Sequence, residues 1–378
     1  ACALCGGSGL LWPDFFKDRC PLCDGVRGWP SSMPAQLAVG HVPTFGSTIT
    51  LQEIEWLCGV GTSEASVENQ DKALAGSDAK AKRARQAQET LAILAAGTYM
   101  AEARCGDARH MVMVDISTSL CKAVVLSKHV PAATWRAPPP KVGNQQLSIE
   151  VRCCTTLDAA QDLATSAERI APPGVLNFAS ARRPGGGFRN GAGAQEETLA
   201  QSSGIYPCLS IHFDTFFVAN RRAKSGIHTH DLIHSVGVPV LRDPYGVLLD
   251  DPYLVDFVTA AAPNRKRRGT NSTAALNALH ERIRRVLHTF ASNGCMDLVL
   301  GAWGCGVFGN DPAAVARLFN EALQEFSSFR RVVFAVLDPG MAKTFSDEFK
   351  LSVAGSERAA TSQIETPGDL DESDALAE

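Results

Sequence analysis

The stretch GVLNFASARRPGGGFRNGAGAQEETLA, residues 174–200, predicts the strand, loop and helix around which the fold is built. Residues 174–179 form a short apolar run, which is typical of a buried strand. Three consecutive glycines follow, and we expect a helix to begin near Gln195. Glycine at this density weakens regular structure, because it loses the most backbone freedom on folding. The loop therefore needs a local function.

Strands and helices alternate through the second half of the chain. Strands are expected at 147–152, 174–179, 231–236, 253–263, 296–303 and 331–337. Helices are expected at 156–168, from residue 195 onward, at 274–292 and at 312–326. This alternation predicts an α/β fold in which a largely parallel sheet is covered by helices on both faces.

The chain divides by composition into segments of different character. The predicted segments are a Cys-rich zinc-binding module at 1–30, a linker with a short helix at 31–78, a helix-and-strand extension at 79–150, the α/β domain at 151–345 and an acidic tail at 346–378. In the extension, a helix should run from Ala79 to a stop at Gly97, with strands at 111–116 and 123–127. The tail is expected to be disordered, because it is rich in acidic and poor in apolar residues.

Composition limits the classes of partner. The net charge of −4 opposes general electrostatic capture of nucleic acid. No apolar run approaches the roughly 20 residues of a membrane-spanning helix, so no membrane partner is expected. Eight of the 12 cysteines are scattered among apolar segments, as reduced core cysteines usually are. We expect an intracellular protein, cytoplasmic or nuclear, that is a monomer.

A second glycine loop, GCGVFGN at 304–310, also follows a buried strand and precedes a helix. Glycines let backbone N–H groups approach a ligand, and a helix N-terminus favours negative charge. Neither loop has the spacing of a Walker or a dinucleotide-binding motif. Each loop alone is more often a turn, but two at the strand ends of one sheet together favour a cradle for a diphosphate.

Two adjacent carboxylates, Glu196 and Glu197, stand at the start of the helix after the first loop. Acidic residues in a first turn are often there only to complement the helix dipole. Neighbouring helical residues, however, point about 100° apart, so the two carboxylates could serve two groups of one ligand. One could accept hydrogen bonds from ribose hydroxyls while the other acts on a glycosidic oxygen.

The GGG-x7-QEE run at 185–197 resembles the signature of microbial-type poly(ADP-ribose) glycohydrolases, which are built on a macrodomain. Further segments resemble that family in the same order, over roughly 80–345. They are TLAILAAGTY (90–99), VLNFAS (175–180), FVTAAAPN (257–264) and LVLGAWGCGVFGNDP (298–312). The resemblance implies a three-layer, macrodomain-like α/β/α sandwich.

The resemblance also implies a role for each residue that matches the family motifs. Glu197 would be the catalytic acid/base, and Glu196 would bind ribose hydroxyls beside the scissile bond. The remaining substrate-binding residues would be Asn177 and Ser180 at the ribose, Gln195 of the QEE motif, Gly185, Gly186 and Gly187 around the diphosphate and distal ribose, Gly304, Gly306, Val307 and Gly309 at the diphosphate, and Phe308 against the distal ribose.

The activity implied is hydrolysis of the ribose–ribose bonds of poly(ADP-ribose), which releases ADP-ribose and needs no catalytic cofactor. Burial, the neighbouring Glu196 and a bound diphosphate would each raise the pKa of Glu197 and favour its acid form. Two alternatives stay open: hydrolysis of single ADP-ribose units from protein or nucleic acid, and a non-catalytic ADP-ribose reader. The intact QEE disfavours a reader. The expected partners are poly(ADP-ribose) or other ADP-ribosylated macromolecules.

Four cysteines near the start, Cys2, Cys5, Cys20 and Cys23, form two C-x2-C pairs. Four thiolates at this spacing suit a tetrahedral structural zinc ion and fill all its positions. Both pairs resemble the knuckles of chaperone-type zinc modules. Three roles stay open for this module: it could recruit a protein partner, contact nucleic acid or simply cap the N-terminus.

Three other groups of residues have side chains suited to chemistry. His228, His230 and His234 lie close together in the sequence; the first two would lie on one side of a strand and could form a metal pair, but a polar loop before a strand at 231–236 is favoured. The basic run NRKRR at 264–268 could be a nuclear signal or contact polymer phosphates, although such runs are more often solvated turns. Cys305 is interpreted as a small residue in a tight loop rather than as a nucleophile.

Overall fold

The computed structural model describes residues 49–59, 78–105, 108–134, 147–223, 225–350 and 353–354. The predicted zinc module, most of the linker and most of the acidic tail lie outside these residues.

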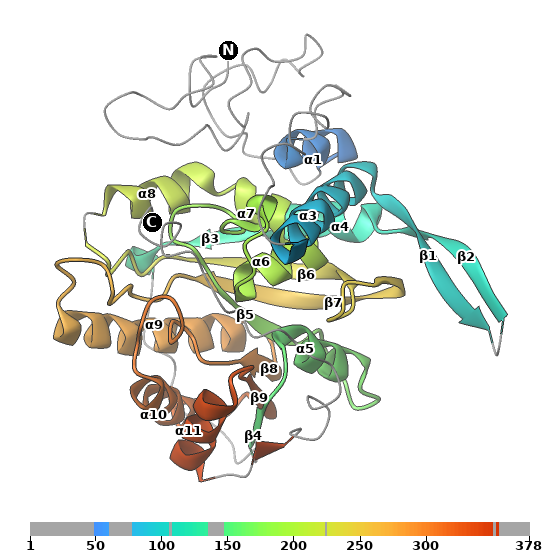
Figure 1. Cartoon of the computed structure of the whole chain (residues 1–378). Helices are drawn as coiled ribbons and strands as arrows, with labels where there is room; N and C mark the ends of the chain where they lie inside the picture. Colours follow the sequence, from blue (N-terminus) through green and yellow to red (C-terminus); the bar gives the residue numbers. More distant parts are fainter. Residues whose placement is uncertain are drawn as a thin grey trace.

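An eight-stranded sheet forms the centre of the molecule (Figure 1). Its strands, in spatial order, are β10 (Val353–Ala354), β4 (Ser148–Arg152), β9 (Arg331–Ala335), β8 (Asp297–Leu300), β5 (Gly174–Phe178), β7 (Leu248–Ala260), β6 (Leu232–Arg242) and β3 (Lys128–Val130). Pairing is parallel from β10 to β7 and antiparallel between β7, β6 and β3. The predicted α/β class and largely parallel sheet are confirmed.

Alternate residues of each strand face two hydrophobic cores, as the pleat of a strand requires. Val175 and Phe257 belong to one core, whereas Leu176 and Val258 belong to the other. The first core is covered by α4 (Ser117–Leu126), α5 (Thr156–Thr165), α6 (Gln195–Ser202) and α7 (Ile205–Ser210), with α3 (Asp78–Ala96) and α1 (Leu51–Cys58) outside them. A π-helical turn at Phe213–Phe217 leads into α8 (Val218–Arg222).

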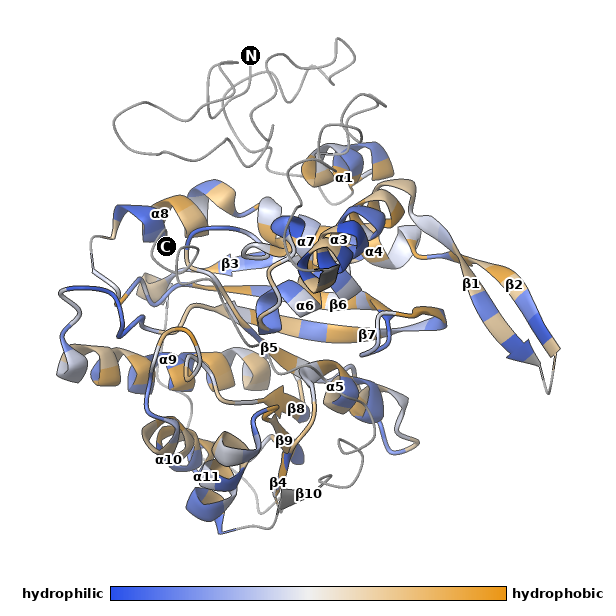
Figure 2. Ribbon diagram, in the orientation of Figure 1, coloured by the Kyte–Doolittle hydropathy of each residue, from blue (hydrophilic) through white to orange (hydrophobic). Residues whose placement is uncertain are grey.

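The opposite core lies under α9 (Ser272–Ser292), α10 (Pro312–Leu323) and α11 (Pro339–Phe349). Each of these helices begins at a side-chain cap, from Asn271, Asp311 and Asp338 respectively. Figure 2 shows the mixed apolar and polar colouring of α9 that one buried and one solvated face produce. The last of the three helices continues past the predicted domain end at 345.

The predicted strand at 123–127 is wrong, because these residues belong mostly to helix α4. A short apolar run fits a buried helix segment as well as a strand. Here the buried residues Leu120, Ala123 and Val124 follow helical spacing. Asp115 holds the start of the helix by accepting a hydrogen bond of 2.8 Å from the Ser117 N–H.

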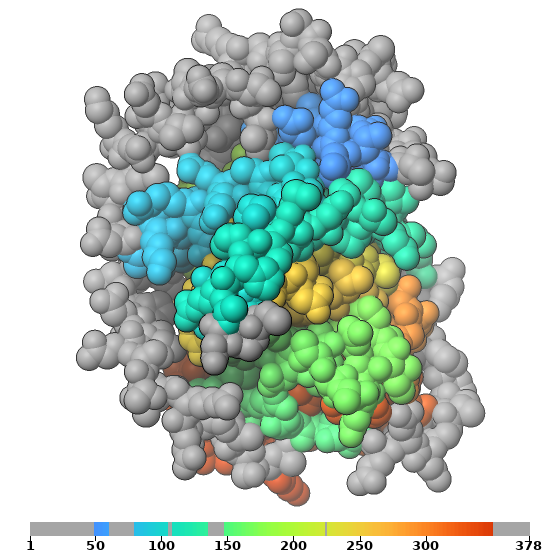
Figure 3. Space-filling view, turned by 90° about the vertical axis from the view of Figure 1, so that its right-hand side faces the viewer, coloured from blue at the N-terminus to red at the C-terminus, as the bar shows by residue number. Residues whose placement is uncertain are grey.

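The extension also contains a hairpin of β1 (Thr98–Cys105) and β2 (Ala108–Asp115), of which only the second strand was predicted. Both strands contact β7, and Tyr99 donates a hydrogen bond of 2.7 Å to the Leu249 carbonyl. Figure 3 shows the hairpin in teal on the face that also carries α1 and α3. Strand β3, also from the extension, completes the main sheet.

In the part of the chain that the structure describes, no helix has the length and apolar character needed to cross a membrane.

Candidate active site

Three loops meet at one edge of the sheet, because β5, β7 and β8 are parallel neighbours. The loops that follow these strands cover 179–194, 261–271 and 301–311. Both predicted glycine loops are among them. This edge, at the carboxyl ends of parallel strands, is where open α/β sheets bind ligands.

Glu196 is held at the end of β5 by the strand and the loop that follows it. Its Oε2 accepts a hydrogen bond of 2.6 Å from the Ser180 N–H, and its Oε1 accepts one of 3.4 Å from Asn177 Nδ2. The same Asn177 amide donates to Thr259 of β7 at 3.2 Å. The side chain is 3% exposed, so its carboxylate has a fixed position beside the two strands.

Glu197 points into the first glycine loop. Its Oε1 accepts a hydrogen bond of 2.9 Å from the Gly187 N–H, and only 9% of the residue is exposed. Burial raises the pKa of this carboxyl, and the Gly187 hydrogen bond lowers it by less, so the net shift is upward. The site therefore favours the acid form of Glu197 more than water does.

Gly186 brings the loop backbone against both carboxylates. Its φ is +59°, in the left-handed region that favours glycine. A Cβ at this position would collide with Glu197 Oε1 and lie 3.1 Å from Glu196 Oε2. The two carboxylates thus converge on one point of the loop.

The side chain of Gln195, which was predicted to bind substrate, makes hydrogen bonds to other residues of the protein. Its Oε1 accepts from the Phe178 N–H at 2.9 Å, and its Nε2 donates to the Leu176 carbonyl at 2.8 Å and to Thr156 Oγ1 at 3.3 Å. Both ends of the amide are therefore engaged. The contacts give Gln195 a positioning function, because they fix the start of α6 to the end of β5.

Segments N-terminal to the α/β domain contact the first glycine loop and hold it in place. Arg83 of α3 donates a hydrogen bond of 2.7 Å to the Gly191 carbonyl, and a Cβ on Gly191 would collide with the Lys80 carbonyl. Arg189 of the loop donates to the Cys58 carbonyl at the end of α1 and to the Tyr206 hydroxyl. None of these contacts was predicted, because they join segments far apart in sequence.

The second glycine loop is closed by Asn310, whose Nδ2 donates to the carbonyls of Pro263 and Gly304 at 2.9 and 3.0 Å. Gly304 has a φ of +74° and leaves no room for a Cβ beside Ala262. Gly306 is different, since no described residue lies within 4 Å of the position its Cβ would take. Its backbone is exposed at the sheet edge, next to Val307 and Phe308.

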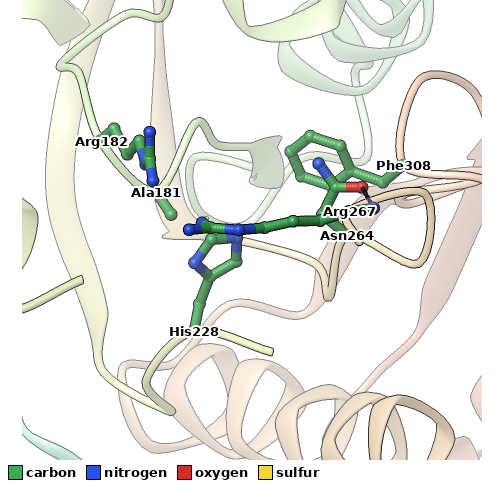
Figure 4. A pocket seen from close by; sticks show the side chains of 6 residues that line it. All are labelled: Ala181, Arg182, His228, Asn264, Arg267 and Phe308. Atoms are coloured by element: carbon green, nitrogen blue, oxygen red, sulfur yellow. Dashed lines mark hydrogen bonds between the residues drawn. The ribbon is translucent and has the colours of Figure 1, made fainter. Parts of the chain in front are cut away.

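A small pocket adjoins this loop (Figure 4). It is lined by Ala181, Arg182, His228, Asn264, Arg267 and Phe308. Of these, only Phe308 was predicted as a site residue. The others come from three different loops, and the one sequence signal was the basic run that contains Arg267.

The remaining candidates do not form a further site in the described residues. Cys305 is buried, and this burial raises the pKa of its thiol to about 12, which disfavours a nucleophilic thiolate. His228 and His230 lie in the predicted loop before β6, and His234 lies in the strand. No group of three or more His, Cys, Asp or Glu side chains is arranged to hold a metal ion there.

Comparison with known proteins places this site in a family. The family described as microbial-type PARG, catalytic domain, matches residues 87–243. Poly(ADP-ribose) glycohydrolase (PARG) from Thermomonospora curvata, known from its crystal structure, shares 37% sequence identity with this chain, and the two structures superpose with a TM-score of 0.62. The match covers 71% of this chain and 99% of that chain. The chain belongs to the microbial-type poly(ADP-ribose) glycohydrolase family.

Other solved glycohydrolases are similar too. PARG from Deinococcus radiodurans, in complex with ADP-ribose, is 38% identical with a TM-score of 0.54; the match covers 61% of this chain and 97% of that one. The T. curvata enzyme bound to the inhibitor ADP-HPD is 36% identical over 71% of this chain and 99% of that one, with a TM-score of 0.62. No curated protein matches the sequence. The family match includes the first glycine loop and both carboxylates of this glycohydrolase.

Proposed function

We propose that this chain is a poly(ADP-ribose) glycohydrolase that hydrolyses the ribose–ribose bond and releases ADP-ribose, with Glu197 as general acid and then general base. The observation that carries the proposal is the buried Glu197 carboxyl with its raised pKa, held by the Gly187 N–H inside a glycine loop. A reader of ADP-ribose needs no such acid. The relatives with ADP-ribose or ADP-HPD bound support this class of substrate.

The first step is protonation of the leaving ribose oxygen by Glu197. Cleavage builds positive charge on the anomeric carbon, and a positioned acid typically contributes about 10²–10⁴-fold to such a reaction. The Glu196 carboxylate, fixed by Ser180 and Asn177, would accept hydrogen bonds from ribose hydroxyls. After the leaving group departs, the Glu197 carboxylate can take a proton from the attacking water.

The diphosphate of the same unit would bind the two glycine loops. Positive-φ backbone at Gly185 and Gly304 lets the loops approach an anion closely with no Cβ in the way. The open surface at Gly306 gives the ligand backbone close access. A bound diphosphate places negative charge near Glu197, so we expect substrate to raise the pKa of this acid further.

The decisive experiment is Glu197→Gln, which keeps the size of the side chain and its acceptor for the Gly187 N–H. We expect hydrolysis of labelled poly(ADP-ribose) to fall by about 10²–10⁴-fold, while ADP-ribose binding is retained. Glu168→Gln, an exposed carboxylate on the surface, is the matched control. Activity of Glu197→Gln within a few-fold of wild type would refute the proposal.

A second substrate in the same assay distinguishes polymer hydrolysis from the removal of single ADP-ribose units. Wild-type protein is incubated with mono-ADP-ribosylated protein beside the polymer, and free ADP-ribose is measured in both. Release from the polymer alone supports the glycohydrolase. Release from the mono-modified protein alone would instead support removal of single units by the same acid.

A further inference from the structure

The pocket beside the second glycine loop is built by four loops at one edge of the sheet. Ala181 and Arg182 follow β5, His228 precedes β6, Asn264 and Arg267 follow β7, and Phe308 follows β8. Figure 4 shows Arg182 and Phe308 on opposite sides, with the Arg267 side chain running between them above the His228 ring.

Hydrogen bonds to backbone carbonyls fix these loops to one another and to α8. The Asn264 N–H donates to the Gly226 carbonyl at 2.7 Å, and the Arg265 N–H donates to the Phe308 carbonyl at 2.9 Å. Arg221 Nε donates to the Arg182 carbonyl at 2.8 Å. The loops that carry the pocket residues are therefore held in place by the protein itself.

The pocket is positively charged. None of its six lining residues is acidic, and two are arginines. A third arginine, Arg282, is fully buried behind them, where it donates to the carbonyls of Ala261 and Ile227. Burial, followed by the charges of Arg282, Arg267 and Arg182, lowers the pKa of His228 to about 3. Burial and, after it, the positive charge of the pocket thus keep this histidine neutral.

His228 itself indicates a missing ligand. Its φ of +62° is in the left-handed region, which costs a non-glycine residue energy and often marks a functional position. Its buried Nδ1 has no hydrogen-bond partner among the described residues. A neutral imidazole can carry its proton on this nitrogen and donate it to an anion. A phosphate oxygen could accept a hydrogen bond from this nitrogen and a charge-assisted one from Arg267.

The pocket is also close to the proposed catalytic carboxylates. The Ser180 N–H contacts Glu196 Oε2, and the next residue, Ala181, already lines the pocket. Consecutive Cα atoms are about 3.8 Å apart, so Arg182 lies within about 8 Å of Ser180 along the chain. The glycine loops after β5 and β8 are assigned to the diphosphate of the terminal unit. Arg182 and Arg267 are not among the glycines of those loops, so these two cations can serve a different phosphate.

We propose that this pocket binds the diphosphate of the penultimate ADP-ribose unit, the unit that leaves when the terminal bond is cleaved. The inference rests on the proposed hydrolysis of poly(ADP-ribose). In that polymer, the leaving oxygen is the 2′-hydroxyl of an adenosine whose own diphosphate is attached to the same ribose. A single ADP-ribose on a protein side chain has no such second diphosphate. The pocket therefore favours the polymer over mono-modified acceptors.

The test compares two substrates that share the terminal unit. One is poly(ADP-ribose); the other is ADP-ribose with an aryl leaving group on the distal ribose, which has no second diphosphate. In Arg267→Gln we expect kcat/KM on the polymer to fall about tenfold or more through KM, as loss of a charge-assisted hydrogen bond implies. Activity on the aryl substrate should be unchanged. Arg267→Glu should lower kcat/KM on the polymer further.

Arg268→Gln is the matched control, because it removes the same charge from an exposed position of the same loop outside the pocket. It should leave both substrates unaffected. Equal losses on the two substrates, or no loss on the polymer, would overturn the subsite while the proposed hydrolysis stands. If wild-type protein hydrolyses neither substrate, the proposed function fails and the subsite fails with it.

Discussion

Gly186 lies so close to Glu197 that a Cβ on the glycine would collide with Oε1 of the glutamate and lie 3.0 Å from its carboxyl carbon. The loop backbone and the proposed acid therefore fit each other with no spare room. Because α6 carries Glu197 and the loop carries Gly186, any side chain at 186 must displace one of them.

Gly186→Ala is accordingly expected to move the acid away from the substrate. We predict a loss of roughly 10²-fold or more in kcat, the size expected when a positioned acid is displaced. Gly237→Ala is the control, because its φ of +62° matches that of Gly186 and no described residue lies within 4 Å of its Cβ position. It should lose about 1–2 kcal/mol of stability from the left-handed backbone and keep its activity. Equal kinetic losses in both variants would contradict a collision at Glu197.

The raised pKa of Glu197 also predicts how stability depends on pH. Burial makes the folded state bind a proton here more tightly than the unfolded chain, whose pKa is near the ordinary value of 4.5. The stability that this group contributes is complete below that value and is lost as the pH rises through the raised pKa. Above the raised pKa, ionised Glu197 therefore destabilises the fold.

Glu197→Gln is neutral at every pH and removes this cost. Its Tm should exceed that of wild type at about pH 8, and the difference should shrink toward about pH 5. A gain of about 1 kcal/mol would correspond to about 2–4 °C in a domain of this size. Thermal unfolding of both proteins across this pH range measures the effect. A Tm difference that stays constant with pH would show that ionisation of Glu197 is not its source.

Cys305 provides a test of the rival idea that the second glycine loop carries a nucleophile. Since burial raises the pKa of its thiol to about 12, almost no thiolate exists at neutral pH. Cys305→Ala should keep glycohydrolase activity within a few-fold, and iodoacetamide should label native Cys305 slowly. Mass spectrometry after labelling can use the partly exposed Cys153 as the internal comparison. Loss of activity in step with labelling of Cys305 would contradict this expectation.

The fold was largely predictable because its central strands are buried on both faces. Such strands are continuous apolar runs, and those at 174–179 and 296–303 are followed by glycine loops that mark their ends. The segment at 123–127 was not predictable in this way. Its apolar run fits either element, and only packing of Leu120 and Val124 on the sheet selects a helix.

The candidate site was predictable where its residues are neighbours in sequence. Glu196, Glu197 and the first glycines lie within one stretch, so glycine density, the paired carboxylates and the resemblance of this stretch to the family motif identified them. Arg83 and Arg189, which hold that loop, contact backbone groups 108 and 131 residues away in the chain. The cationic pocket likewise collects single residues from four loops. No periodicity or motif links such residues, because the sheet topology alone brings them together.

The four N-terminal cysteines lie outside the described residues, and their spacing carries the last prediction. We propose that Cys2, Cys5, Cys20 and Cys23 hold one structural zinc ion, since each C-x2-C pair supplies two thiolates at a suitable separation. Elemental analysis of the full chain should find about one zinc per molecule. Cys20→Ser should lower this content, whereas Cys154→Ser, a partly buried cysteine of the α/β domain, should not.

The proposed catalytic residues all belong to other segments, so zinc loss should leave hydrolysis of the aryl substrate close to that of wild type. Chelation of the purified protein offers the same comparison without mutation. The metal would be expected to stabilise its own short segment, because so few residues cannot bury a sufficient core. Full zinc content in Cys20→Ser would exclude the four-cysteine site. An equal loss of zinc in Cys154→Ser would place the metal in the α/β domain instead.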